Sequence, residues 1–152
     1  MKTLHNQDDK AEIVERLSKI QATSQRHWGR MTPHQAICHL TDSFRLVTGE
    51  KAASTISNLF TRSLVKWIAI HTPLPWLHGV KTMPEMDQEI SGTPPVEFER
   101  DKRELEIMIE RFTKQPRDFQ FSPHPIFGAM TESEWMVWAY RHCDHHLRQF
   151  GL

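Results

Sequence analysis

Two histidines in the last part of the chain have a spacing that suits a shared metal ion. The 152-residue sequence contains ten histidines and only two cysteines. His142 and His146 stand four residues apart in a segment, residues 131–150, in which Trp135 and Trp138 mark the same apolar face. Side chains at this spacing lie one above the other on a helix, with Cβ atoms about 5–6 Å apart. The pair therefore predicts a metal site.

His39 is the expected third ligand. It shares one side of another helical segment, residues 33–49, with Ala36 and Leu40. Three imidazoles leave a coordination position open, whereas structural zinc usually has four protein ligands. Nitrogen ligands suit zinc, nickel, copper and iron, of which we expect zinc or nickel. Such an ion can polarise a substrate oxygen, or bind and deprotonate a water or a thiol.

Four further residues are candidates for supporting roles. His145 and Gln149 follow the ligand positions on the same helix and could contact a ligand or a bound water. His124, in a stiff loop between two prolines, and Asp42, three residues after His39, are candidate catalytic groups. The alternatives are a structural loop residue for His124 and a solvated carboxylate for Asp42. The alternative for the three ligand histidines is three separately hydrogen-bonded core imidazoles.

The positions of proline, glycine and capping residues predict helices and the loops between them. Thr32 precedes Pro33, and Thr131 precedes Glu134 by three residues, as at helix starts. No strand pattern competes with helical spacing. The expected helices cover residues 8–24, 33–49, 56–71, 96–114 and 131–150. We predict an all-α protein, a four-helix bundle in a single domain over residues 1–152. An extra helix and a long irregular connection, residues 74–95, separate helices two and three.

Composition excludes several classes of partner. Nineteen basic and nineteen acidic residues give a formal net charge of zero, so we expect no nucleic-acid partner. No uncharged apolar run is long enough for a signal peptide or a membrane span, so we expect a cytoplasmic protein without membrane contact. Cys38 and Cys143 each stand beside a histidine in helical segments, and we expect reduced, buried side chains.

Two segments of the sequence resemble a known superfamily. MTPHQAICHLTDSFR and the later HPIFGAMTESEWMVWAYRHCDHHLRQFG resemble the DinB-like superfamily, most closely its uncharacterised branch with a last helix reading H-x-D-H-H-L-R-Q-F-G. Its members are four-helix bundles, often dimeric, with one ligand histidine in the second helix and an H-x-x-x-H pair in the last. The resemblance implies a homodimer, with His39 as the lone ligand and His142 and His146 as the pair.

Two hypotheses about function follow. Characterised relatives in the resembled superfamily include thiol-dependent S-transferases, a maleylpyruvate isomerase that uses a low-molecular-weight thiol, and proposed metal hydrolases. The first hypothesis is therefore a metal-dependent hydrolase or thiol-dependent S-transferase that acts on a small molecule. We expect its pocket between the loop at residues 124–128 and the connection at residues 74–95. The second hypothesis is a non-enzymatic metal- or ligand-binding bundle, linked to stress.

Overall fold

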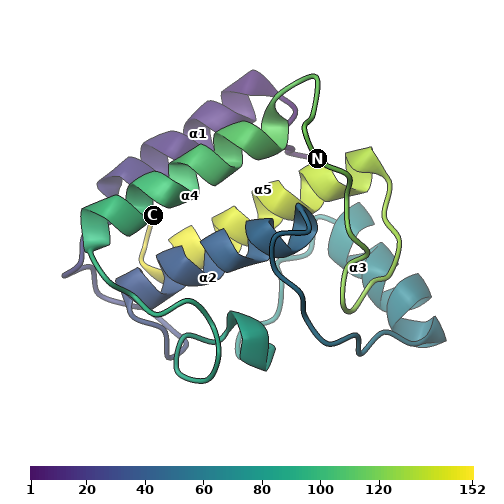
Figure 1. Cartoon of the computed structure of the whole chain (residues 1–152), viewed down its shortest axis with the longest axis horizontal. Coiled ribbons are helices and arrows are strands. Elements are labelled where there is room, and N and C mark those ends of the chain that lie inside the picture. The colour runs from purple at the N-terminus through teal and green to yellow at the C-terminus, as the bar shows by residue number, and fades with distance from the viewer.

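The computed structural model describes residues 1–152 and contains five α-helices and no strands (Figure 1). A π-helix, η1 (Thr61–Val65), leads directly into α3, and a short 3-10 helix, η2 (Pro84–Met86), lies in the following connection. The all-helical prediction is thus confirmed. The helices are α1 (Gln7–Lys19), α2 (Pro33–Val47), α3 (Lys66–His71), α4 (Phe98–Thr113) and α5 (Glu132–Gln149).

Reciprocal caps fix the first turns of the two helices that carry the predicted ligands. The Thr32 hydroxyl accepts the Gln35 N–H at 3.2 Å, while the Gln35 side chain accepts the Thr32 N–H at 2.8 Å. Thr131 and Glu134 form the same pair of bonds at the start of α5. Each reciprocal pair of bonds is a capping box, and it satisfies two N–H groups that the start of a helix leaves free. Both helices begin where the sequence predicts.

Helix α1 ends earlier than expected. It was predicted to reach residue 24, but it stops at Lys19, and Ile20 has an extended backbone. The Ser24 hydroxyl accepts the Gln21 N–H at 3.0 Å and closes a turn there. Serine and threonine compete in this way with helical hydrogen bonds, which explains the early end.

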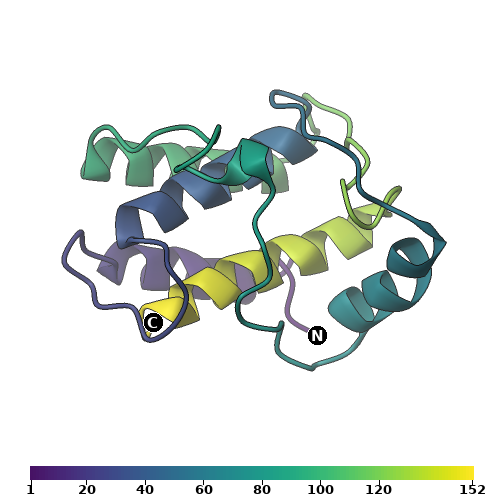
Figure 2. The same ribbon diagram turned by 90° about the horizontal axis from the view of Figure 1, so that it is seen from below.

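The four long helices run along the long axis of the molecule and share one core (Figures 1 and 2). Helix α2 packs against α4 and α5, and α1 packs against α5. Large, fully buried side chains from all four helices fill the space between them, including Leu17, Phe44, Phe112 and Trp135. This packing holds the inner faces of α2 and α5 against each other, which is where the predicted ligands lie.

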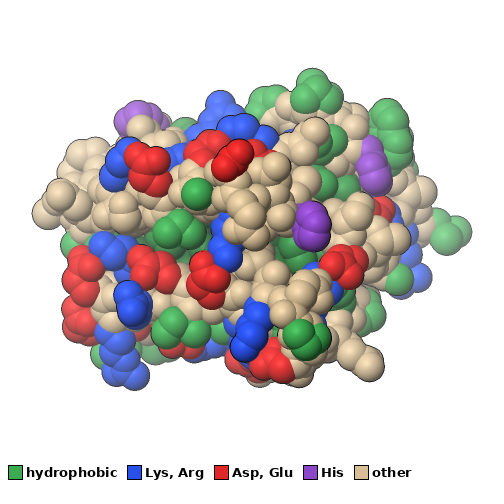
Figure 3. All heavy atoms as spheres, turned by 90° about the horizontal axis from the view of Figure 1, so that it is seen from above, with side chains coloured by type: hydrophobic (Ala, Val, Ile, Leu, Met, Phe, Trp, Pro, Cys, Tyr) green, Lys and Arg blue, Asp and Glu red, His purple; other side chains and the backbone are tan.

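The segment at residues 56–71 differs from its prediction. Its helix begins at Leu59 rather than at residue 56, because the Asn58 carboxamide accepts the Thr61 N–H at 3.0 Å and starts the helix there. Most of its apolar side chains face outward, and only Ile70 is buried. In Figure 3 hydrophobic side chains gather toward the right-hand end of the molecule, the end at which α3 lies in Figure 1. Charges of both signs are interspersed elsewhere. The exposed ones are Leu59, Phe60, Leu64, Trp67 and Ile68.

None of the helices has the length and apolar character that a membrane crossing requires.

Candidate metal centre

The three predicted ligand histidines lie together between α2 and α5. The His39 ring is 5.1 Å from the His142 ring and 4.7 Å from the His146 ring, and the last two are 5.1 Å apart, centre to centre. One nitrogen from each ring lies within 4.8 Å of the other two. His39 and His146 are only 5% and 9% exposed. The group is therefore a compact, buried set of nitrogen donors that could hold a metal ion.

Contacts behind the rings orient two of these imidazoles. His39 Nδ1 lies 2.9 Å from the Met86 carbonyl oxygen, and His146 Nδ1 lies 3.2 Å from the Gln149 Oε1. Since both oxygens can only accept, each Nδ1 carries the hydrogen, and each Nε2 keeps its lone pair. This arrangement is common around metal-bound histidines, where the second ring nitrogen donates to an oxygen.

The carboxamide of Gln149 is itself held in place. Its Nε2 donates to the Trp28 carbonyl at 3.0 Å. Gly29, with a positive φ of 74°, lets the backbone approach this closely, because a Cβ atom there would lie 2.6 Å from the Gln149 Nε2. The loop between α1 and α2 is thereby connected through Gln149 to His146.

Only one of the two ring nitrogens of His142 has a partner within hydrogen-bond distance. Its Nε2 lies 3.1 Å from the His39 Nε2, while its Nδ1 is buried without a partner. Because His39 Nε2 presents a lone pair, either a proton or a cation must lie between the two nitrogens. Tetrahedral zinc with bonds of 2.0–2.1 Å places two nitrogens about 3.3 Å apart, which is close to the observed separation. The donor set and its spacing thus fit a metal ion.

The electrostatics of the site favour neutral rings. Burial lowers the pKa of His39, although the bond to the Met86 carbonyl opposes this. Burial lowers the pKa values of His142 and His146 well below the usual range, and the neighbouring imidazoles add to the effect. Neutral imidazole is the form that binds a metal ion, so the fold keeps the rings ready for ligation near neutral pH.

His145 lies on the outer side of the three rings. Its ring is 5.2 Å from that of His146 and 4.6 Å from that of Trp28, and burial lowers its pKa to about 4. Trp76 covers the neighbouring position, with its ring 5.7 Å from the His142 ring. A cavity of about 510 Å³ opens beyond His145 and Trp76. Pro73, Pro75, Trp76 and His78 from the predicted connection line it, whereas the loop at residues 124–128 does not.

His124 has a structural environment. Its Nδ1 accepts the N–H groups of Ile126 and Phe127, each at 3.1 Å, and its backbone pairs with Gly128. Burial lowers its pKa to about 3. The Trp138 ring lies between it and the site, 5.6 Å from the His124 ring and 4.9 Å from the His142 ring. The structure therefore does not bring this candidate catalytic residue to the three histidines.

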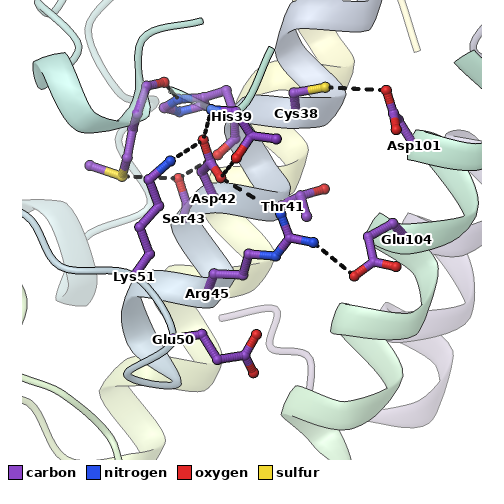
Figure 4. A network of polar contacts seen from close by, with 12 residues as sticks. Cys38, His39, Thr41, Asp42, Ser43, Arg45, Glu50, Lys51, Asp101 and Glu104 are labelled. Atoms are coloured by element: carbon purple, nitrogen blue, oxygen red, sulfur yellow. Dashed lines mark hydrogen bonds and ion pairs between the residues drawn. The ribbon is translucent and has the colours of Figure 1, made fainter. Parts of the chain in front are cut away.

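Asp42 is fully buried rather than solvated, which corrects the simpler reading of this carboxylate. Its oxygens bond the Lys51 amine at 2.8 Å, the Thr93 N–H at 2.7 Å and the Thr93 hydroxyl at 2.6 Å, and the Gln88 amide is 3.3 Å away. Figure 4 shows Lys51 reaching this carboxylate beside His39. Because its lone pairs are occupied, Asp42 fastens residues 88–93 over α2 and is not placed for proton transfer.

Sequence reasoning missed three parts of this environment: the Met86 carbonyl, Trp28 and Trp76. A backbone carbonyl leaves no signal in a sequence. Trp76 stands beside Pro75 in the irregular connection, and Trp28 stands beside Gly29 in another loop. The one available signal was that a large aromatic residue stands in each of these loops, where it could form a wall of the site.

The fold and this site define a class: an all-helical protein with a buried three-histidine group that could bind metal. Residues 1–151 match the protein family described as "Protein of unknown function (DUF1569)", and the chain belongs to that family. No curated protein matches the chain, and no solved structure does.

Proposed function

We propose that the protein is a metal-dependent enzyme with a DinB-like four-helix bundle in one domain, holding one divalent ion, zinc or nickel, on His39, His142 and His146. The observation that carries this proposal is the pair of Nε2 atoms 3.1 Å apart, with a third imidazole beside them and one nitrogen of each ring within 4.8 Å of the other two. A cation between the nitrogens satisfies the lone pairs that the fold directs at one point.

The reaction that we propose is hydrolysis, or transfer to a low-molecular-weight thiol, of a small molecule in the cytoplasm. An ion with three protein ligands supplies a Lewis acid that polarises a substrate oxygen or activates a water or thiol. The protein residues orient and shield the site. Met86 and Gln149 fix the tautomers of His39 and His146, and the packed core excludes bulk water.

The exposed apolar side chains of residues 59–68 support a homodimer. Five large apolar side chains project from this short region, which is more than a lone surface usually carries. We propose that a second copy covers them.

A non-enzymatic metal-binding protein is the second candidate. It is favoured by one observation: none of the three histidines lines the large cavity, since His145 and Trp76 stand between. In that case the ion stabilises the bundle, or its binding senses metal supply.

The test starts from protein purified without a metal-affinity tag. Elemental analysis should find about one zinc or nickel per chain, and the metal-loaded protein should turn over at least one member of ester, amide and electrophile-plus-thiol panels. His142→Ala serves as the control and should lose both metal and activity. Turnover retained by this variant would overturn the proposal. One bound metal without turnover in any panel would select the non-enzymatic candidate.

A further inference from the structure

The large cavity beside the three histidines has the size of a small-molecule site. Its volume of about 510 Å³ lies within the usual range of about 300–1,000 Å³ for such sites. Trp76 and His145 form the wall that it shares with the candidate metal centre. A single layer of side chains therefore separates a ligand in the cavity from the nitrogen cluster.

Aromatic rings make up much of the lining. Trp28 and His78 stack face to face, with ring centres 3.9 Å apart and planes 6° from parallel. Trp76 and Tyr140 add two further rings to the lining. Flat aromatic surfaces bind flat ligands well, because offset stacking adds to the burial of apolar area. The lining therefore favours a planar ligand.

The two carboxylates of the lining already have close cationic partners. Lys2 donates to Glu12, and Arg16, just outside the lining, lies 2.8 Å from Asp144. Their negative charges are therefore compensated before any ligand enters.

The two arginines of the lining are less fully compensated. Arg141 donates to the carbonyls of Thr72 and Leu74 and has no carboxylate within ion-pair distance, and burial lowers its pKa. Arg148 lies 3.8 Å from the already paired Asp144, and its side chain is 60% exposed. A guanidinium has five N–H donors and suits a carboxylate, so the cavity has spare donors for an anion.

We propose that this cavity binds a planar organic anion, an aromatic or conjugated carboxylate, with the carboxylate at Arg141 and Arg148 and the ring among Trp28, His78 and Trp76. The assignment of this anion as the substrate of the metal centre rests on the proposed function. The binding itself needs no metal, because the lining contains none of the three ligand histidines.

The experiment compares two probes on metal-free full-length protein by isothermal titration calorimetry. The probes are 2-naphthoate and its uncharged analogue 2-naphthylmethanol. We expect the carboxylate to bind at least about tenfold more tightly, since a charge-assisted hydrogen bond contributes more than a neutral one. Arg148→Gln should remove most of this preference and leave the affinity for the alcohol unchanged. Arg148 is exposed, so this variant keeps the fold.

Arg103→Gln is the matched control, because Arg103 is a 76% exposed arginine on α4, away from the cavity. It should change neither affinity. His78→Ala should weaken both probes to a similar extent, since it removes part of the aromatic lining. Equal affinities for the two probes, no binding of either, or an equal effect of Arg103→Gln would each overturn the proposal. Failure of metal binding would leave these results standing, so the two proposals fail separately.

Discussion

Helix α2 contributes to two groups of possible metal ligands, and they differ in how their polar atoms are satisfied. One is the histidine group, His39 with His142 and His146. The other is His34, Cys38 and Asp101, where α2 meets the start of α4 (Figure 4 shows the contact between Cys38 and Asp101). In both groups, three potential donor atoms lie within 4.8 Å of one another.

The second group is complete without an ion. The Asp101 Oδ2 accepts His34 Nε2–H at 2.7 Å, the Val96 N–H at 2.9 Å and the Glu97 N–H at 3.3 Å, and the Cys38 thiol is 3.7 Å away. The carboxylate thus ties α2 to the start of α4. In the histidine group, by contrast, the lone pair of His39 Nε2 faces only another imidazole nitrogen, the His142 Nε2 at 3.1 Å.

The comparison shows that closeness of donor atoms is a weak criterion for a metal site. The stronger criterion is whether protein hydrogen bonds already use the donor atoms, because buried polar groups seldom remain unsatisfied. On this criterion the histidine group is the better candidate for a cation, because its converging nitrogens bond no oxygen of the protein.

The largest expected effect is the loss of metal binding when one histidine is removed. His142→Ala should lower the affinity for zinc by more than the 10–100-fold that loss of an outer contact costs, since a direct ligand is lost. Elemental analysis and competition with a zinc-binding dye measure this. His34→Ala is the matched control from the other group and should bind zinc like the wild type. Equal losses of zinc affinity in the two variants would contradict the distinction between the two groups.

The second prediction concerns stability. Asp101→Ala should lower the free energy of unfolding by about 2 kcal/mol, because it leaves several donors without their acceptor and weakens the start of α4. Urea denaturation of the metal-free protein gives the value. Asp118→Ala, at an exposed carboxylate, should have a small effect. Both variants should bind as much zinc per chain as the wild type. A loss of zinc in Asp101→Ala alone would contradict the interpretation that the second group binds no metal.

The two groups should also respond to different pH ranges. Burial lowers the pKa of His142 in the folded protein, whereas the unfolded chain has the ordinary value of about 6.5. Below that pH the unfolded state binds more protons, so stability falls as pH falls, by at most about 1.4 kcal/mol per pH unit for each such histidine. Urea midpoints of metal-free protein between about pH 6.5 and pH 4.5 should show this fall, with a shallower slope in His142→Asn.

The pH dependence that Asp101 contributes to stability should appear only at lower pH. Burial raises its pKa, but hydrogen bonds from Val96, His34 and Glu97 outweigh this and hold the value below 3.8. Its contribution is therefore present above about pH 3.8 and is lost as pH falls further. Asp101→Ala should keep the wild-type slope above about pH 4.5. A shallower slope in this variant would contradict the separation of the two groups.

The smallest expected effect is that of Cys38. Burial raises the pKa of its thiol to about 12, so the thiolate that a metal needs is disfavoured. Cobalt-loaded protein should lack the near-ultraviolet absorption of a cobalt–thiolate bond, and Cys38→Ser should give the same spectrum. A band that this variant loses would place a metal on the second group.

The starts of α2 and α5 and the shared face of His142 and His146 could be predicted from local patterns, whereas the choice of His39 also drew on the superfamily resemblance. The boxes at Thr32 and Thr131 mark helix starts, and a four-residue spacing fixes which side chains share a face. The homodimer and the metal itself stay predictions.

What covers each face could not be predicted, because it depends on loops that pack from a distance. Asp42 was a candidate catalytic group with a solvated carboxylate as the simpler alternative, but it is buried and bonded to Lys51 and Thr93. Spacing also predicted a helix over residues 56–71 but not what its apolar side chains contact, and this segment lies at one end of the molecule with most of them exposed.

The contact between His39 and the Met86 carbonyl has a consequence for how this family can vary. Every residue type has a main-chain carbonyl, so position 86 can change during evolution without losing the contact. An insertion or deletion near η2 is different, since one residue shifts an extended backbone by about 3.3–3.6 Å and removes the oxygen from His39. For the contact with His39, the length of this segment therefore matters more than the residue type at position 86.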